Sequence, residues 1–483
     1  MILFLASRPV VPTARRLSSA AFRTAAGPRP GPPPRGTGAG PAAPRRTNDT
    51  DHTDHTDHPD DGAAEAASGP RPSPRSLLAP YRRLFAVPGA AAFTLAGLVG
   101  RVAGSMLGVG MVLMIATVRD SYALAGAVSA TGLAVTALTG PLLGRLVDRH
   151  GQARVAVPAV AVYALGATAM LLCVHYGAPA WALFVCAVGS SGVPSLGSMT
   201  RARWAAVHRD DPAARHTANS FEQVVDEVCF MAGPALAMVL CTAVFPEAGV
   251  ATAAVLLVVG TLLFAAQRRT EPPPRTRATA VSGSGSGSGS SGAEGSLARS
   301  PGLRVVVLTF LATGAVFGSM EVATVATVES YGHGSASSAV LALQAAGSCV
   351  AGLVFGALPV RGSAATRFLA GVAAMAVAAL PLLAANGLAT LTPLLFVAGM
   401  ATAPTMISGM TLVHRLTPPT RLNEGMTTVY TGLLVGISAG AAAGGWTVDH
   451  LGPHAGYTAP ATAAALALLA AAGGAGRLRR SLG

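Results

Sequence analysis

The sequence predicts an all-α integral membrane protein, with twelve transmembrane helices in two pseudo-symmetric six-helix bundles. Three observations predict this fold. Hydrophobic residues make up 51% of the chain and charged residues only 11%, which is too apolar for a soluble domain. Apolar runs recur along the chain, each about twenty residues long, the length that a helix needs to cross about 30 Å of hydrocarbon. Short motifs of the first half also recur in the second half.

The expected spans follow one another with short connections. In chain order they cover approximately residues 90–117, 121–143, 153–175, 179–200, 218–244, 247–267, 303–328, 335–358, 367–386, 389–413, 421–447 and 455–475. Glycine and proline occur inside many of these runs. Membrane helices tolerate both residues, because neighbouring helices satisfy the backbone groups that they leave free.

The remaining segments predict the domain organisation. Residues 1–80 are rich in Pro, Gly, Arg and Ala without sustained periodicity, so we expect a disordered N-terminal tail. Residues 268–300 contain the tract SGSGSGSGSSG and are expected to form a flexible linker. This linker separates a first bundle at 81–267 from a second at 301–475, and residues 476–483 form a C-terminal tail.

The arginines predict the orientation, because loops that carry positive charge stay in the cytoplasm. With an even number of spans both termini share one side, and that side holds nearly all arginines near the spans, whereas the opposite loops hold only Arg119. In the first half the arginine-rich side carries Arg145, Arg149, Arg154, Arg201, Arg203, Arg209 and Arg215. We therefore expect both termini in the cytoplasm of a bacterium and the protein in its plasma membrane. The net charge of +13 follows from this asymmetry, not from a nucleic-acid surface.

The sequence lacks residues that several classes of protein need for their function. All 34 basic residues are arginine, whereas a phosphate-binding P-loop and a protein kinase each need a lysine. The chain has no H-E-x-x-H sequence, and its five cysteines have no C-x-x-C spacing. We therefore expect no enzyme activity, no cofactor and no metal site.

Two pairs of motifs indicate that the halves arose by duplication. GRVAGSM, starting at Gly100 in span one, and GAVFGSM, starting at Gly314 in span seven, share five of seven positions. Spans four and ten each place a proline five residues after a glycine, at Gly189 and Gly399. The offsets, 214 and 210 residues, are nearly equal. Two such halves of matching orientation are related by an axis along the membrane normal, which predicts a cavity between them.

Between spans two and three the chain reads GRLVDRHGQAR from Gly144. This loop resembles the signature loop of the major facilitator superfamily, commonly written G-x-L-a-D-r-x-G-r-k-r, although Gln152 and Ala153 replace two customary basic residues. With the topology and the repeat, the resemblance covers residues 84–475 and assigns no subfamily. It implies a transporter that works by alternating access.

The same loop is expected to act as a conformational latch formed by Gly144, Asp148, Arg149, Gly151 and Arg154. Asp148 can accept hydrogen bonds from nearby arginines or from a helix N-terminus while the cytoplasmic side is closed. The two glycines permit close approach of the backbone. The alternative is that the arginines of the loop only anchor the topology.

Five ionisable residues lie at membrane depth, where such groups are costly and mark function by default. They are Arg101 in span one, Glu222, Asp226 and Glu227 in span five, and Glu321 in the outer part of span seven. Glu222 and Asp226 share a helix face, whereas Glu227 is rotated by about 100°. We consider these residues candidates for substrate binding and proton coupling. The alternative is a buried ion pair of Arg101 with Asp226 or Glu227 that only fixes helix packing.

Span eleven carries a stripe of glycines on one face. Gly432, Gly436, Gly440 and Gly444 follow at a spacing of four. We expect the stripe to let a neighbouring helix approach closely.

Together these features predict a secondary active transporter that moves a small organic solute across the plasma membrane, with protons as the coupling ion. Gly233-Pro234 in span five resembles a fragment of the antiporter motif of the superfamily, which favours export. The alternatives are a solute importer or uniporter, and a receptor or scaffold that has the fold without transport. The expected partners are the small-molecule substrate, protons and the lipid bilayer, with no nucleic acid, and we expect a monomer.

Overall fold

A computed structural model describes residues 74–274, 300–359 and 362–482. Most of the expected N-terminal tail and the Ser-Gly tract of the expected linker lie outside the described residues. The helices of the first half are α2 (Ala90–Arg119), α3 (Tyr122–His150), α4 (Gln152–His175), α5 (Ala180–Gly189), α6 (Leu196–Val207), α7 (Pro212–Ala243) and α8 (Ala248–Ala266), followed by the short turn η1 (Arg268–Thr270). Helix α2 packs against α7 and α8, and α4 packs against α5 and α8.

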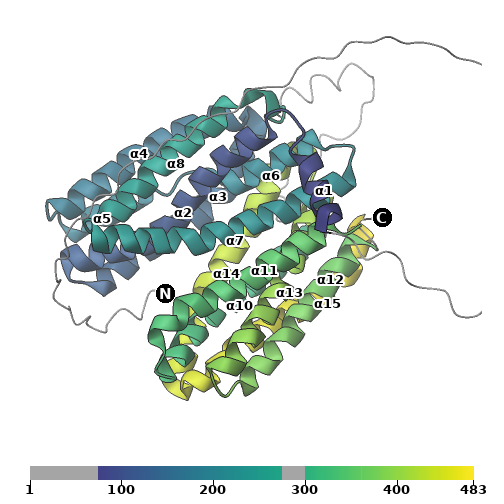
Figure 1. The fold of residues 1–483 in the computed structure, drawn as a ribbon. Helices are drawn as coiled ribbons and strands as arrows, with labels where there is room; N and C mark the ends of the chain where they lie inside the picture. The colour runs from purple at the N-terminus through teal and green to yellow at the C-terminus, as the bar shows by residue number, and fades with distance from the viewer. Residues whose placement is uncertain (1–73, 275–299, 360–361, 483) are drawn as a thin grey trace, which may run out of the picture. The chain divides into compact units, whose positions relative to one another are not determined.

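The second half forms a corresponding bundle (Figure 1). Its helices are α10 (Pro301–Ser330), α11 (Ser337–Ala357), α12 (Ala364–Ala379), α13 (Leu388–Leu416), α14 (Leu422–Leu451) and α15 (Thr458–Leu482), with the short turns η3 (Gly334–Ala336), η4 (Leu380–Ala384), η5 (Pro419–Arg421) and η6 (Pro453–Tyr457). Helix α10 packs against α14 and α15, and α11 against α13. In the described part of the chain, eleven helices are long and apolar enough to cross a membrane. The predicted all-α fold of two bundles is confirmed.

The fourth expected span, 179–200, is not one continuous helix. It is interrupted at residues 190–195, between α5 and α6, and α6 continues to Val207. Residues 190–194 include two serines, Gly192 and Pro194, which are poor helix formers, and Pro194 also lacks the backbone N–H that a helix needs. The matching proline in the second half, Pro404, lies inside the continuous helix α13. It is preceded by alanines and one threonine, which are better helix formers as a group.

Both ends of the described chain are more helical than expected. Helix α1 (Pro74–Leu84) starts inside the segment 1–80 that the composition predicts to be disordered. It is held because Leu84 is buried and the Tyr81 hydroxyl donates to the carbonyl of Leu353 at 2.8 Å. At the other end α15 continues past residue 475 to Leu482, because Leu478 is buried in the second bundle.

The glycine stripe of span eleven lets a neighbouring helix approach closely, as predicted, and the structure shows that this helix is α10. Gly436 lies against the backbone of Leu311 and Gly440 against that of Ala315 so closely that a Cβ atom at either glycine would overlap with the neighbouring helix. Close packing of this kind compensates in a membrane for the weak hydrophobic driving force between helices.

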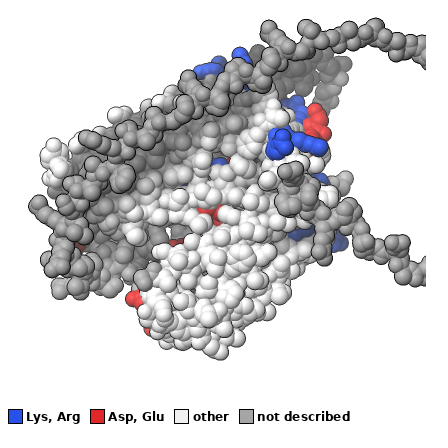
Figure 2. Space-filling view, viewed as in Figure 1, with Lys and Arg blue, Asp and Glu red and all other residues white. Residues whose placement is uncertain are grey.

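The two bundles contact each other mainly through α3 with α14 and α7 with α11, and also through α6 with α14. Helix α7 also contacts α13. The C-terminus of α3 meets the N-terminus of α14, and the N-terminal part of α7 meets the C-terminus of α11. Arginines cluster at these helix ends, and we call this the arginine-rich end. Figure 2 shows most of the visible arginine atoms, in blue, gathered toward one end of the face in view.

Candidate substrate and coupling site

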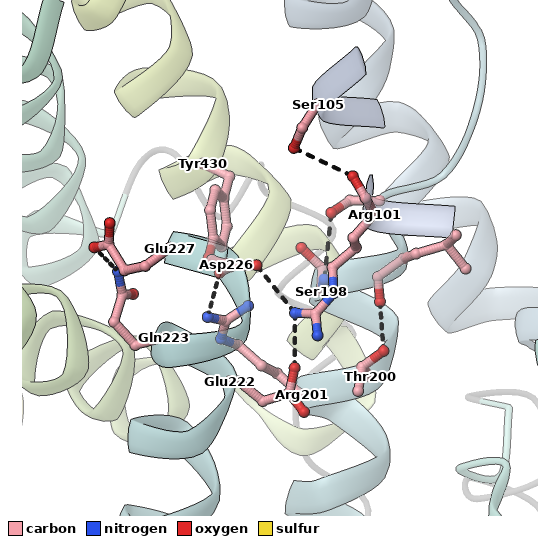
Figure 3. A network of polar contacts seen from close by, with 12 residues as sticks. Arg101, Ser105, Ser198, Thr200, Arg201, Glu222, Gln223, Asp226, Glu227 and Tyr430 are labelled. Carbon is pink, nitrogen blue, oxygen red and sulfur yellow. Dashed lines mark hydrogen bonds and ion pairs between the residues drawn. The ribbon is translucent and has the colours of Figure 1, made fainter. Parts of the chain in front are cut away.

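Asp226, near the middle of α7, accepts hydrogen bonds from three other helices (Figure 3). Arg101 of α2 donates from Nη1 to Oδ1 at 3.0 Å, and Arg201 of α6 donates from Nη2 to Oδ2 at 2.7 Å. The hydroxyl of Tyr430 on α14 donates to Oδ2 at 2.7 Å. Since α14 belongs to the second bundle, this carboxylate connects the two halves of the protein.

Glu222 lies one turn before Asp226 and shares its arginine partner. Its Oε2 lies 2.7 Å from Arg101 Nη1, and its Oε1 accepts a hydrogen bond from Trp204 Nε1 at 2.7 Å. The side chain of Glu222 is completely buried. Two guanidinium groups therefore face two carboxylates, which balances the charge of a largely buried cluster.

Glu227 has a different environment, as its rotation around α7 predicts. It accepts hydrogen bonds from Ser348 Oγ of α11 at 2.8 Å and from Gln223 Nε2 at 3.1 Å. Thr402 of α13 in turn donates to Ser348 at 2.9 Å. Figure 3 shows Glu227 on the side of α7 that faces away from Arg101. Within the described residues its hydrogen-bond partners are neutral, and Ser348 and Thr402 belong to the second bundle.

The interrupted fourth span explains how Arg201 reaches Asp226. Ser195 caps the N-terminus of α6, where its hydroxyl accepts from the backbone of Ser198 at 3.2 Å. The restarted helix then buries Arg201, which is 1% exposed. From the sequence, Arg201 is expected among the arginines of the cytoplasmic loops. It belongs instead to the buried cluster, because Asp226 compensates the cost of removing its charge from water.

Arg203, also counted with the loop arginines, is buried as well. Its guanidinium donates to Gln152 Oε1 at 2.8 Å and to the carbonyls of Phe264 and Gln267 at 3.0 Å and 2.8 Å. It lies 3.8 Å from the centroid of the Phe264 ring. These contacts tie α6 to α4 and to the end of α8, so Arg203 fixes packing.

The partners Arg201, Trp204 and Tyr430 were not among the predicted site residues. The break before α6 could have indicated Arg201 and Trp204 as site residues, because a helix that restarts there carries both side chains on neighbouring turns. The imidazole of His208 stacks on Trp204 just beyond this helix, with 5.8 Å between centroids, and its burial there lowers the pKa of His208. No pattern in the sequence distinguishes Tyr430.

Several guanidinium nitrogens of the cluster have no hydrogen-bond partner among the described residues. They are Nε and Nη2 of Arg101 and Nε and Nη1 of Arg201. Buried donors without a partner are rare and costly in proteins. The cluster therefore has spare donors beside its two carboxylates.

The fifth predicted residue, Glu321, lies half-buried in α10 of the second bundle. The structure thus brings Arg101, Glu222 and Asp226 into direct contact and places Glu227 beside them with other partners.

The predicted latch residue Asp148 contacts the N-terminus of α14. Its Oδ1 accepts from the backbone N–H of Asn423 at 3.1 Å and from Asn423 Nδ2 at 2.8 Å. Its Oδ2 accepts from the backbone N–H of Glu424 at 2.8 Å. The N–H groups in the first turn of a helix have no partner within the helix, and a negative charge there is favourable.

Two arginines lie beside this contact and interact with the side chain of Glu424. Arg421 donates to both carboxylate oxygens of Glu424, at 2.9 Å and 2.8 Å, and Arg145 Nε lies 3.6 Å from the same group. Gly144 lies directly against α14, because a Cβ there would be 2.9 Å from the carbonyl oxygen of Asn423. A glycine at this position is therefore needed for the two helices to meet.

Gly151 forms the corner between α3 and α4. Its φ of 99° is in the region that favours glycine, and its N–H donates to the carbonyl of Val147 at 2.9 Å. Arg149 and Arg154, which flank this corner, are exposed.

A second contact between the bundles lies at the same end. His216 Nε2 of α7 lies 2.9 Å from the carbonyl oxygen of Phe355, to which it can only donate, and Thr217 donates to the carbonyl of Gly356 at 2.9 Å. These groups satisfy carbonyls in the last turn of α11. Side chains of the first bundle thus cap one helix start and one helix end of the second.

Comparison with known proteins gives a consistent result. The family model of the Major Facilitator Superfamily matches residues 93–392 and 367–474. Among solved structures, the human organic anion transporter MFSD10 (TETRAN) is similar over 81% of this chain and 99% of its own, with 15% identity and a TM-score of 0.60. A bacterial homologue of the iron transporter ferroportin in an outward-facing state is similar over 82% and 99%, with 14% identity and a TM-score of 0.62. The E. coli fucose:proton symporter is similar over 80% of this chain and 98% of its own, with 12% identity and a TM-score of 0.59. No curated protein sequence matches the chain.

Proposed function

Because this chain belongs to the Major Facilitator Superfamily, we propose that it is a secondary active transporter that exports a small organic solute in exchange for protons. The family match and the apolar helices make it a multi-pass membrane protein of a transporter family. We propose likewise that protons are the coupling ion, that the direction is export and that the protein lies in a bacterial plasma membrane. Both termini then lie in the cytoplasm, which puts the arginine-rich end and its closed latch on the cytoplasmic side.

The observation that carries the proposal is that two carboxylates of α7 accept hydrogen bonds from the other bundle. Asp226 accepts from Tyr430 and Glu227 accepts from Ser348. Alternating access moves one bundle relative to the other around a central site. These bonds then break or form in each cycle, and their strength depends on whether the carboxylate is charged. A proton on such a carboxylate therefore shifts the conformational equilibrium.

The two carboxylates have different roles in this mechanism. Asp226 is held as an anion by two arginines, which favours the charged form. Glu227 has only neutral partners among the described residues, and an unpaired charge at membrane depth is costly. Glu227 is therefore the group that takes up and releases the proton, while Asp226 holds the arginines in place.

The spare donors of the arginine cluster indicate the chemistry of the solute. Arg101 and Arg201 have buried N–H groups that lack partners within the described structure. A solute with a carboxylate or a similar group of acceptor oxygens would satisfy them and would compete with Asp226 for the guanidinium groups.

The export direction rests on the antiporter fragment in α7. Gly233 lies against the backbone of Ser105, because a Cβ there would be 3.0 Å from the Ser105 carbonyl carbon. The fragment thus brings α7 and α2 into close contact at the helices that carry Asp226 and Arg101.

The test uses everted membrane vesicles and a panel of labelled small carboxylic acids. An antiporter accumulates its solute when the vesicle interior is made acidic, whereas a symporter does so under the opposite gradient and a receptor moves no member of the panel. Glu227→Gln should still exchange the solute down its gradient but should no longer respond to the imposed pH difference. Asp226→Asn should lose transport, and Glu329→Gln, an exposed acid at the end of α10, should behave as the wild type. Full pH-driven accumulation by Glu227→Gln would reject this residue and make Glu321 the next candidate.

A further inference from the structure

A basic pocket lies at the arginine-rich end, between α7 of the first bundle and α12 and α13 of the second. Its lining includes Arg215, His216, Asn219, Arg367, His414 and Arg415, and no acidic residue lines it. The pocket is open to solvent, and its space, with the solvent in the opening included, is about 430 Å³. None of these residues belongs to the arginine cluster around Asp226 or to the latch around Asp148.

The charges around this pocket repel each other. Its three arginines remain protonated at any physiological pH, and Arg215 is on a different bundle from Arg367 and Arg415. In the described part of the chain, no carboxylate forms an ion pair with any of the three. The nearest acid along α7, Asp211, is exposed and accepts from the backbone N–H groups that start this helix.

Buried nitrogens of the pocket also lack partners within the described structure. They are Arg367 Nε, His414 Nε2 and His216 Nδ1. His216 is only 5% exposed, and its other nitrogen already faces the carbonyl of Phe355. Native proteins rarely leave buried polar atoms unsatisfied, so such a group calls for an explanation. A ligand with acceptor oxygens would satisfy Arg367 Nε and His414 Nε2, which line one pocket, whereas His216 Nδ1 is itself an acceptor while Nε2 donates to Phe355.

We propose that this pocket binds a phosphate group and that the bound phosphate links the two bundles at the arginine-rich end. A phosphate presents several acceptor oxygens and negative charge, which guanidinium groups recognise in a fixed geometry. By contacting Arg215 on one side and Arg367 and Arg415 on the other, it removes the repulsion between the bundles. It thereby stabilises the arrangement in which this end is closed.

Two sources of phosphate fit this chemistry. The pocket is formed by helix ends that carry arginines, and basic clusters at the end of membrane helices meet the headgroups of anionic lipids. A soluble phosphate compound could reach the same residues from the aqueous side. The site does not depend on the identity of the transported solute, so it can be tested without a transport assay.

The first measurement is the thermal stability of the full-length protein in a non-ionic detergent. Inorganic phosphate is titrated at constant ionic strength with chloride as the replaced anion, and in a second series short-chain phosphatidylglycerol is compared with phosphatidylcholine. Binding to the folded state raises Tm in a saturable manner. A response to inorganic phosphate indicates a soluble ligand, whereas a response to phosphatidylglycerol alone indicates the lipid headgroup.

The second measurement compares variants. Arg367→Gln and Arg415→Gln should each weaken the response, with an apparent Kd about tenfold higher, since each removes a charged donor. Arg415 is exposed, so its variant reports on binding even if Arg367→Gln folds poorly. The matched control Arg209→Gln removes an exposed charge outside the pocket and should respond as the wild type. The proposal is wrong if neither phosphate nor phosphatidylglycerol raises Tm, or if all three variants respond alike.

Discussion

Replacing Asp148 by asparagine tests whether the contact between α3 and α14 is a latch. The carboxylate accepts three hydrogen bonds, two of them from backbone N–H groups in the first turn of α14. In Asp148→Asn an NH₂ group replaces one acceptor oxygen and faces an N–H donor, so at least one hydrogen bond is lost. The remaining hydrogen bonds are no longer made to a charged acceptor. A charge-assisted bond contributes about 1.5–3 kcal/mol and a neutral one about 1 kcal/mol, while a charge at a helix N-terminus adds about 0.3–2 kcal/mol.

The closed arrangement should therefore lose about 2–4 kcal/mol, which shifts the equilibrium between the closed and open forms of this end about 30- to 700-fold. The abundance of the protein in the membrane should change little, because no core packing is removed. Transport should fall, since the cycle requires both forms to be populated.

The assay is a distance measurement between spin labels at the arginine-rich end, in a variant whose five cysteines are replaced by alanine. The labels are attached to cysteines that replace Asp210 in the first bundle and Arg479 in the second, and both positions are exposed. Asp148→Asn should lengthen the measured distance. The control Asp449→Asn changes an aspartate that also follows a valine in the last turn of its helix but is exposed. An unchanged distance and unchanged transport for Asp148→Asn would show that the loop only anchors the topology.

Two further predictions concern the buried cluster and the orientation. Arg201→Met leaves the charge of Asp226 with one arginine fewer, and breaking a buried pair costs about 3–5 kcal/mol. A marked fall in Tm is expected in a thermal unfolding assay, whereas Arg209→Met should unfold like the wild type, and equal Tm values would contradict a structural role for the pair. Reporter fusions after residues 150 and 480 should be active as cytoplasmic reporters, and one near residue 332 as an external reporter. A cytoplasmic signal near 332 would contradict the twelve-span topology.

Much of the fold could be predicted because its causes act locally along the chain. The length of each apolar run decides that it can cross the bilayer, and the duplicated motifs predict two bundles. The faces of α7 were predictable as well, since helical periodicity places Glu222 and Asp226 together and turns Glu227 away. Gly192 and Pro194 are the local signal for the break in the fourth span, and the apolar length of the run does not reveal it.

The amino-acid sequence by itself determined which segments enter the membrane and which helix faces carry charge, because hydropathy and periodicity are properties of each segment. Only the tertiary structure decided which groups meet. Tyr430 is 204 residues away from Asp226, and Arg201 is a cluster residue only because α6 carries it inward. From the sequence, Asp148 can be expected to contact either arginines or a helix N-terminus. The packing of α3 on α14 places it against the N-terminus of α14. Such contacts depend on the rotation and depth of helices relative to each other, which the pattern of one segment does not contain.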